Sequence, residues 1–429
     1  MRVAFTTLGC RLNQFETDAL EQVTRAAGHT IVGADEPADI VVVNSCTITH
    51  DADADTRQVV RRAARGGARV VVTGCMANSD PAGLAALPGV ALVLGNREKE
   101  RFAELALGTG DGGVHVAAVD LGRRVRMTRL RPSIDPRRSR AYLKIQDGCD
   151  YRCSFCIVPR VRGRSASLPV AEAQAQLADL VAAGAPEVVL TGVHLGTYGR
   201  DLEPRTDLAA LVRALLPGLG DAMLRLGSVD PHEVDDELIA LLAGDRRLCR
   251  HLHLPVQSGD DGVLRAMRRG HRSDDLRRLV PRLTAAVPGI AVATDVIAGF
   301  PSETPAAFDA TVALLDELPL AGMHVFTYSE REGTAAASMR PQVDPGERAA
   351  RTRVLRDLAA RKARAFRTSQ LGAVVPAVVH RARDRRGELV ALTDNFIKAT
   401  LQGPDSLLGR AVRVRLRSAD EPAAATLVD

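Results

Sequence analysis

The sequence predicts an α/β chain in three parts: a small doubly wound α/β domain, a central partial parallel barrel of six β/α units, and a small all-β domain at the C-terminus. Three observations predict this. Short β-branched runs alternate with helical segments up to residue 118, strand-like runs recur six times from residue 141, and short glycine-broken strands follow a long basic helix. The expected divisions are 1–118, a basic linker at 119–140, 141–366 and 367–429.

The N-terminal domain rests on four apolar runs that are short and nearly continuous, which is typical of buried parallel strands. Helical segments are expected between them. The predicted strands are 3–7, 40–44, 70–73 and 90–94, and the predicted helices are 13–27 and 52–65.

The linker at 119–140 is rich in arginine and has no clear apolar period. A solvated connector and a phosphate-contacting segment explain it equally well. Its arginines are Arg123, Arg124, Arg126, Arg129, Arg131, Arg137, Arg138 and Arg140.

The central domain shows six strand candidates separated by helical stretches, such as 170–183 and 274–287. This spacing favours a partial parallel barrel, with an open doubly wound sheet as the alternative. The strands are expected at 142–145, 188–191, 223–229, 251–256, 292–297 and 324–328. After a basic helix at 346–367, the tail strands are expected at 374–379, 388–393, 397–401 and 412–416.

The composition excludes several classes of protein. The formal charge of +5 in 429 residues is too small to establish nucleic-acid binding by itself. No apolar run of membrane-spanning length occurs, and the N-terminus lacks the pattern of a signal peptide. Seven cysteines, an odd number in a long chain, argue against a secreted disulfide scaffold. We therefore expect a cytoplasmic protein whose thiols serve metals or catalysis.

The strongest motif is the CxxxCxxC segment formed by Cys149, Cys153 and Cys156, directly after the first predicted barrel strand. A short loop with this spacing aims three thiolates at one point. A structural zinc site needs a fourth ligand, and no cysteine or histidine follows closely. Three ligands with one open position suit a [4Fe–4S] cluster that binds a further molecule at its fourth iron.

The other notable cysteines are Cys10, Cys46 and Cys75, each of which follows a predicted strand of the N-terminal domain. Parallel strands end at one edge of a sheet, where ligands usually bind. Gly9 and Gly74 permit the tight turns that such convergence requires. We expect a second metal site here, although isolated free cysteines are commonly buried as small apolar residues. Cys249 is interpreted as structural.

With these residues in place, the chain resembles the radical S-adenosylmethionine methylthiotransferases, the MiaB/MtaB/RimO group, over essentially its whole length. The sequence at Cys10 is most similar to the MtaB branch, whereas the segment at 254–257 is closer to the isopentenyladenosine branch. The matching segments are LGCRLNQ at 8–14, NSCT at 44–47, TGCM at 73–76, LKIQDGC at 143–149, PRVRGR at 159–164, LPVQSG at 254–259 and DVIAGFP at 295–301.

The resemblance implies a methylthiotransferase that modifies carbon 2 of threonylcarbamoyladenosine at tRNA position 37. It implies two [4Fe–4S] clusters, one on each cysteine triad, and S-adenosylmethionine as cofactor. Because the C–H bond at carbon 2 is unactivated, cofactor radical chemistry is needed to break it. It further implies an electron donor such as flavodoxin or ferredoxin, contact with the anticodon region of tRNA, and an RNA-binding TRAM-like tail.

Several further residues are candidates for the site. Gln257 and Ser258 end a barrel strand, on the face where active sites gather, and are expected to contact cofactor, with backbone capping as the alternative. Asp295 and Glu303 are secondary candidates of the same kind. Three arginines that follow the cysteine loop are expected to grip substrate phosphate or a cofactor carboxylate, with simple solvent exposure as the alternative: Arg160, Arg162 and Arg164.

Three other functions stay open at this point. The chain could modify isopentenyladenosine in tRNA, or an aspartate of a ribosomal protein, by the same chemistry. It could also be a zinc-stabilised RNA-binding protein without catalysis.

Overall fold

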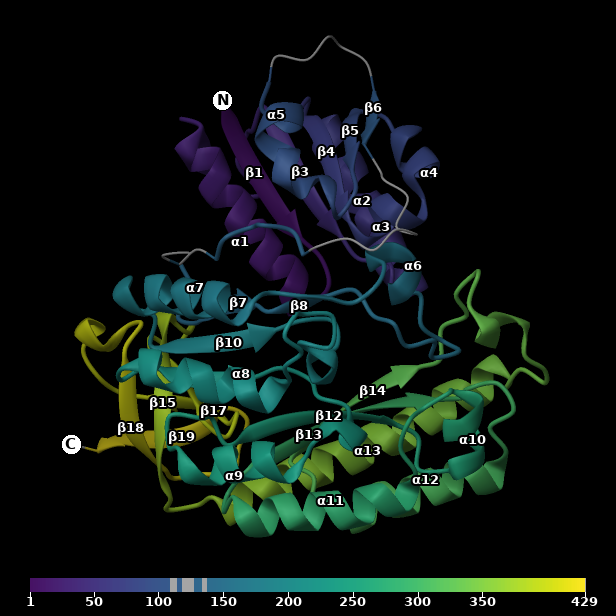
Figure 1. Ribbon diagram of the computed structural model, residues 1–429, viewed down its shortest axis with the longest axis vertical. Helices are drawn as coiled ribbons and strands as arrows, with labels where there is room; N and C mark the ends of the chain where they lie inside the picture. Colours follow the sequence, from purple (N-terminus) through teal and green to yellow (C-terminus); the bar gives the residue numbers. More distant parts are fainter. Residues whose placement is uncertain (109–113, 118–126, 133–136, 429) are drawn as a thin grey trace. The chain divides into compact units, whose positions relative to one another are not determined.

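The computed structural model describes residues 1–108, 114–117, 127–132 and 137–428 (Figure 1). The chain forms two compact units, and each is described by itself. Unit 1 comprises Met1–Ser133, Gln146–Leu168 and Ser329–Ala337, and unit 2 comprises Ile134–Ile145, Pro169–Tyr328 and Ser338–Asp429. Neither unit coincides with a predicted domain, so the four-part division of the chain stays a prediction. Much of the predicted linker, at 119–126 and 133–136, lies outside the described residues.

Unit 1 is built on a parallel sheet of six strands in the order β2-β1-β3-β4-β5-β6. The predicted doubly wound domain is confirmed, and the four predicted strands form its centre. The strands are β1 Arg2–Thr7, β2 Thr30–Val32, β3 Ile40–Ser45, β4 Arg69–Gly74, β5 Val90–Leu94 and β6 His115–Ala117. The helices are α1 Arg11–Ala26, α2 His50–Arg65, α3 Cys75–Ser79, α4 Pro81–Ala85, η1 Glu98–Arg101 and α5 Phe102–Ala106.

The register of this sheet aligns the ends of its three central strands. Thr7 of β1 pairs with Asn44 of β3, which pairs in turn with Thr73 of β4. The valine-rich runs of β3 and β4 are almost completely buried, and burial on both faces is what a parallel sheet demands. The segments that follow β1, β3 and β4 therefore leave the sheet at one edge.

Two later segments complete unit 1. In the first, Gln146–Leu168, the strand β8 Gln146–Asp147 pairs antiparallel with β9 Ala166–Ser167, and the short helix α6 Val158–Arg162 lies between them. The second, Ser329–Ala337, contains the start of the 3₁₀ turn η5 Ala335–Ser338.

The core of unit 2 is a half-barrel of six parallel strands in two groups, ordered β11-β10-β7 and β12-β13-β14. Single bridges from Leu224 to Leu248 and from Ser228 to His253 link the groups. The predicted partial barrel is therefore confirmed. Its strands are β7 Ala141–Lys144, β10 Glu187–Thr191, β11 Met223–Leu226, β12 His251–Gln257, β13 Ala291–Ala298 and β14 Gly322–Thr327. The accompanying helices are α7 Val170–Ala182, η2 Leu195–Thr197, α8 Leu208–Leu215, η3 Leu216–Leu219, η4 Pro231–Glu233, α9 Asp236–Gly244, α10 Asp261–Ala266, α11 Ser273–Ala286, α12 Pro305–Glu317 and α13 Pro345–Ser369.

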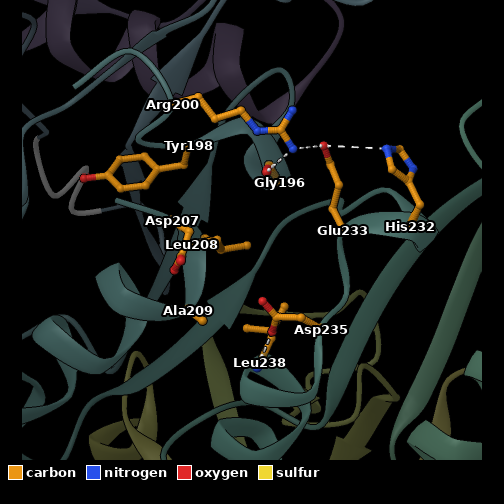
Figure 2. A pocket seen from close by; sticks show the side chains of 10 residues that line it. All are labelled: Gly196, Tyr198, Arg200, Asp207, Leu208, Ala209, His232, Glu233, Asp235 and Leu238. Carbon is orange, nitrogen blue, oxygen red and sulfur yellow. Dashed lines mark hydrogen bonds and ion pairs between the residues drawn. The ribbon is translucent and has the colours of Figure 1, made fainter. Parts of the chain in front are cut away.

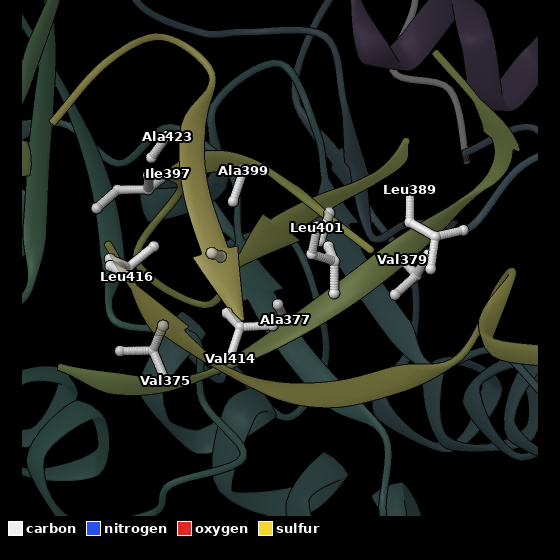
Figure 3. Packing of buried hydrophobic residues seen from close by; sticks show 12 residues of the cluster. Val375, Ala377, Val379, Leu389, Ile397, Ala399, Leu401, Val414, Leu416 and Ala423 are labelled. Carbon is white, nitrogen blue, oxygen red and sulfur yellow. The ribbon is translucent and has the colours of Figure 1, made fainter. Parts of the chain in front are cut away.

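The tail is a closed five-stranded barrel in the order β15-β16-β17-β19-β18. Alternate residues of each strand point inward and form a small aliphatic core (Figure 3). The all-β prediction is confirmed, with one strand more than expected. The elements are β15 Val374–Arg383, β16 Leu389–Thr393, β17 Lys398–Leu401, η6 Asp405–Leu407, β18 Ala411–Leu416 and β19 Ala423–Val428.

A buried arginine joins the tail to the half-barrel. Arg225 on β11 pairs with Glu187 on the neighbouring β10 at 2.7 Å and donates to the main-chain carbonyls of Thr393 and Asp394 in the tail. Arg250 adds a bidentate pair to the Asp394 carboxylate, at 2.7 and 3.1 Å. Half-barrel and tail therefore share one polar core. Among the described residues, no helix is both long and apolar enough to cross a membrane.

Candidate iron–sulfur sites

The sheet edge of unit 1 brings Cys10, Cys46 and Cys75 together. Cys46 directly follows β3 and Cys75 directly follows β4, while Cys10 is the N-cap residue of α1. Because the central strands end in register, the three thiols leave the same edge. Their mutual electrostatic influence reflects this proximity, since Cys75 and Cys10 both act on Cys46.

Two glycines allow this approach. Gly9 has a φ of +95°, and a Cβ built on it would lie 2.9 Å from the sulfur of Cys46. Gly74 has a φ of +96°, and a Cβ there would meet the Ser45 carbonyl oxygen at 2.4 Å. Any side chain at either position would displace a cysteine loop.

Burial changes the pKa of two thiols at this site. Burial raises the pKa of Cys46 to about 11, and the neighbouring thiols add to the rise. Burial also raises the pKa of Cys75, against the lowering effect of Arg162. A metal must therefore displace protons to bind here, as is usual for thiolate sites. Three converging sulfurs fit an iron–sulfur cluster with one open position.

The second triad lies in the loop between β8 and β9. The Cys156 N–H donates to the Cys153 carbonyl at 3.1 Å, which tightens the loop. Burial raises the pKa of Cys149 to about 12, and Cys156 and Cys153 raise it further, so these three sulfurs are also close. The amide of Tyr151 lies 3.4 Å from the Cys149 sulfur and is placed to stabilise a thiolate.

Both triads belong to unit 1, and a cysteine of the first contacts the segment that follows the second. Cys75 packs with Ile157 and Val161, which are the residue after Cys156 and a residue of α6. The side-chain amide of Asn96 donates to the Val161 carbonyl at 3.0 Å. The loop that carries one triad is thus packed against the sheet edge that carries the other.

The three predicted phosphate-binding arginines have different surroundings. Arg160 and Arg164 are exposed, and Arg164 pairs with Asp150 at 3.1 Å. Arg162 is buried, and its guanidinium is held between Glu16 and Asp147. The structure therefore does not bring the three together as one phosphate-binding surface.

The predicted cofactor residues also differ from each other. Gln257 ends β12 in a left-handed conformation with a φ of +73°, which is costly for a residue with a side chain. Ser258 is fully buried, and its hydroxyl accepts from the Asp260 amide at 3.2 Å, the capping arrangement that competes with a cofactor contact. Glu303 is occupied by the Gly299 amide and Arg351, each at 2.8 Å.

The structure places Asp295, a secondary candidate from the sequence, in a row of polar side chains across four segments of the half-barrel, and the sequence did not predict the row itself. The Ser228 hydroxyl lies 2.7 Å from His253 Nδ1, and His253 Nε2 lies 3.0 Å from Asp295. His324 contacts the same carboxylate oxygen at 3.0 Å. Although burial opposes it, hydrogen bonds from the two histidines lower the pKa of Asp295 to about 2. His251 and His253 alternate along β12, and this pattern indicated part of the row. No sequence pattern indicated Ser228.

A polar cavity lies beside the starts of α8 and α9. Arg200 donates to Glu233 at 3.0 Å, and Glu233 lies beside His232 in the lining (Figure 2). The N-cap side chains Asp207 and Asp235 accept from helix amides at 2.8 Å, so both helix starts are capped internally. Because these charged groups already have partners within the protein, we assign no ligand to the cavity.

Comparison with known proteins agrees with this geometry. Residues 2–95 match the family model described as uncharacterized protein family UPF0004, and residues 143–315 match the radical SAM superfamily. A Bacillus subtilis protein named threonylcarbamoyladenosine tRNA methylthiotransferase MtaB is 34% identical, with 98% of this chain and 94% of that protein covered.

Other relatives carry different names. A tRNA-2-methylthio-N(6)-dimethylallyladenosine synthase of Maricaulis maris is 32% identical, covering 97% of this chain and 95% of that protein. The ribosomal protein uS12 methylthiotransferase RimO of Roseiflexus castenholzii is 36% identical, covering 80% and 77%. Among solved structures, the radical S-adenosylmethionine methyltransferase TsrM of Kitasatospora setae superposes with a TM-score of 0.57 at 18% identity. The superposition covers 76% of this chain and 74% of that one and shows a similar fold alone.

Proposed function

Because the chain belongs to the radical S-adenosylmethionine methylthiotransferase family, we propose that it adds a methylthio group to carbon 2 of threonylcarbamoyladenosine at position 37 of tRNA. One observation supports the proposal: two three-cysteine sites lie in one compact unit, and Cys75 of one packs against Ile157 and Val161, which follow the cysteines of the other. A non-catalytic zinc protein would not need two adjacent triads, each with an open position.

Each triad has its own task in this proposal. Cys149, Cys153 and Cys156 would hold the cluster that binds S-adenosylmethionine, and Cys10, Cys46 and Cys75 would hold the cluster that provides sulfur. When bound, these groups supply the radical chemistry and the methylthio sulfur that no amino-acid side chain provides. The chain contributes thiols in fixed positions, which would give up their protons when the clusters bind.

The remaining site residues are proposed to bind and orient. Gln257 lies at the end of β12 in a strained conformation, consistent with a contact to cofactor. Arg160 and Arg164 are exposed beside the cysteine loop and suit phosphate oxygens of the tRNA anticodon region. Electrons would come from a flavodoxin or ferredoxin, and we infer a cytoplasmic location because the clusters need a reducing compartment.

The choice of substrate within the family rests on identity and coverage together. Four relatives named for threonylcarbamoyladenosine are 33–34% identical over 83–98% of this chain. Two dimethylallyladenosine relatives are 32% identical over 97% and 96% of it, and the RimO relatives cover 80%. The alternatives are an isopentenyladenosine-type tRNA base, favoured by the segment at 254–257, and an aspartate of ribosomal protein uS12.

Mass spectrometry of tRNA nucleosides tests the proposal. A deletion strain should lose the methylthio form of threonylcarbamoyladenosine, the intact gene should restore it, and a Cys153→Ala gene should not. Unchanged levels of this nucleoside in the deletion strain would refute the substrate. Loss of the dimethylallyl product, or of methylthio-aspartate in uS12 peptides, would identify the corresponding alternative.

A further inference from the structure

The two cysteine loops of unit 1 are connected by more than apolar packing. A buried guanidinium links them on one side, and a short segment from late in the chain links them on the other. Both links consist of directional hydrogen bonds between charged or amide groups, and these define a distance more strictly than aliphatic contacts do.

Arg162 forms the first link. Its Nη1 donates to Glu16 at 2.9 Å and to Asp147 at 3.1 Å, and its Nη2 donates to Asn13 at 2.6 Å. Asp147 lies two residues before Cys149, whereas Asn13 and Glu16 lie on α1, whose N-cap residue is Cys10. One planar side chain therefore contacts the approach to each triad.

Asn13 extends this link to two cysteine loops of the sheet edge. Its side-chain amide donates to the Leu8 carbonyl at 2.7 Å and to the Ser45 carbonyl at 2.9 Å. Those carbonyls lie just before the Gly9–Cys10 turn and just before Cys46. The guanidinium of Arg162 also acts electrostatically on Cys75, the third cysteine of the sheet edge.

The segment Ser329–Ala337, here called the strap, forms the second link. Arg331 donates to the Thr47 hydroxyl and to the Asp53 carboxylate, both at 2.8 Å, and Thr47 directly follows Cys46. Further along the strap, the Ala336 amide donates to the Ser154 carbonyl at 2.8 Å, next to Cys153. The strap thus contacts one loop of each triad.

The charges around Arg162 balance within the buried region. Glu16 binds both Arg162 and Lys99, and Lys99 also donates to Asn96 at 2.9 Å. All of these side chains are buried. Burying ions is costly, and two well-packed apolar residues would hold two loops together at least as well. The charges therefore favour a role in geometry over one in stability alone.

We propose that Arg162 and Arg331 are positioning residues that set the separation of the two iron–sulfur sites, and through it the fraction of S-adenosylmethionine cleavage that ends in methylthio transfer. This inference rests on the proposed function. This role of Arg162 differs from the phosphate contact that the sequence predicts. It also predicts that a shift of one loop uncouples S-adenosylmethionine cleavage from methylthio transfer, while both sites still hold their clusters.

The experiment compares reconstituted full-length Arg162→Gln, Arg162→Lys and Arg331→Gln with wild type. The matched control is Arg101→Gln, because Arg101 is also paired with carboxylates in unit 1 but is half-exposed and remote from the cysteines in sequence. Three quantities are measured: iron per chain, the ratio of 5′-deoxyadenosine to methylthio product, and the magnetic interaction between the two reduced clusters by electron paramagnetic resonance.

We expect Arg162→Gln and Arg331→Gln to keep about eight irons per chain, the content of two [4Fe–4S] clusters. The ratio of 5′-deoxyadenosine to product should rise at least tenfold and the magnetic interaction should change. The ratio for Arg162→Lys should lie between those of Arg162→Gln and wild type, because lysine keeps the positive charge but lacks the planar fork of the guanidinium. The control should match wild type in all three measurements.

An unchanged ratio and an unchanged magnetic interaction in the loaded Gln variants would overturn the inference. If Arg162→Gln fails to load iron, Arg331→Gln decides by the same criteria, since the strap lies outside both cysteine loops. Wild-type enzyme that makes no methylthio product at all would instead refute the proposed function, so the two failures are distinguishable.

Discussion

Replacing Arg225 should separate the cost of an unpaired buried charge from the value of the pair itself. The Arg225 and Glu187 side chains are both fully buried, and two nitrogens of Arg225 contact the two carboxylate oxygens at 2.7 and 2.9 Å. Arg225→Met leaves Glu187 buried without its bidentate partner, although Arg140 still lies 3.7 Å away. Such a broken pair costs about 3–5 kcal/mol of unfolding free energy.

The double variant Arg225→Met/Glu187→Leu removes both charges and should recover most of that loss. It does not recover all of it, because the Thr393 and Asp394 carbonyls lose their donors. An unsatisfied buried acceptor costs about 1–3 kcal/mol, less where water reaches it. We therefore expect the double variant to be more stable than either single variant and less stable than wild type.

Hydrogen exchange of the full chain measures these differences. A loss of about 3–5 kcal/mol corresponds to roughly a hundredfold to several-thousandfold faster exchange of the slowest amides in β11 and β16. The matched control is Arg247→Gln, whose pair with Asp245 at 2.6 Å is partly exposed and should contribute at most about 1 kcal/mol. Less than tenfold acceleration in Arg225→Met, or a double variant no better than the single ones, would refute the reasoning.

Three further predictions concern the sites and the tail. Gly9→Ala should lower the iron content from about eight to about four per chain, because the added Cβ would meet Cys46. Gly28→Ala is the control and should keep the full iron content, because Gly28 has a similar φ of +79° but no atom lies within 4 Å of a Cβ built there. Arg413 is exposed on the tail barrel, and Arg413→Gln should reduce the slope of log K against log salt for tRNA binding by the amount expected for about one phosphate contact. An unchanged slope would exclude this contact. Hydrogen bonds lower the pKa of Asp295 to about 2 in the folded protein. The ionised carboxylate therefore contributes about 2 kcal/mol to the free energy of unfolding; this contribution is complete above the unfolded pKa near 4 and is lost as the pH falls through 2. The stability difference between wild type and Asp295→Asn should therefore shrink from pH 5 to pH 2 in urea unfolding, and a constant difference would contradict this.

The sequence predicted the central strands of both sheets because their signal is local. Runs such as that of β3 are apolar on both faces, which only a buried strand explains well. The missed strands lack that signal: β2 and β6 have three residues each at the sheet edges, and β19 begins with three alanines. Pairing with β17 and β18 makes β19 a strand, which is a long-range effect.

The same distinction applies to the site. Convergence of Cys10, Cys46 and Cys75 follows from strand order, which a sequence pattern reveals. The burial of Arg162 does not, because Glu16 lies 146 residues away in the chain and no local pattern relates the two. An arginine in a basic stretch is therefore predicted as a phosphate ligand, although three-dimensional packing gives it a carboxylate partner.

Within unit 2, the tail barrel and the candidate cofactor residue occupy opposite ends of the half-barrel strands. The tail is contacted by Met223, the first residue of β11, by Cys249 and Arg250 directly before β12, and by Arg225, two residues further along β11; Met223 and Cys249 pack with Val378. Gln257 is the last residue of β12. At about 3.3 Å per residue, the seven residues of β12 separate the two ends by about 23 Å. If Gln257 contacts cofactor as proposed, an RNA bound to the tail must span that distance to present a base to that end of the strands. Substitutions on the outer surface of the tail should therefore weaken tRNA binding and raise KM, while kcat, which depends on the cysteine sites, stays the same.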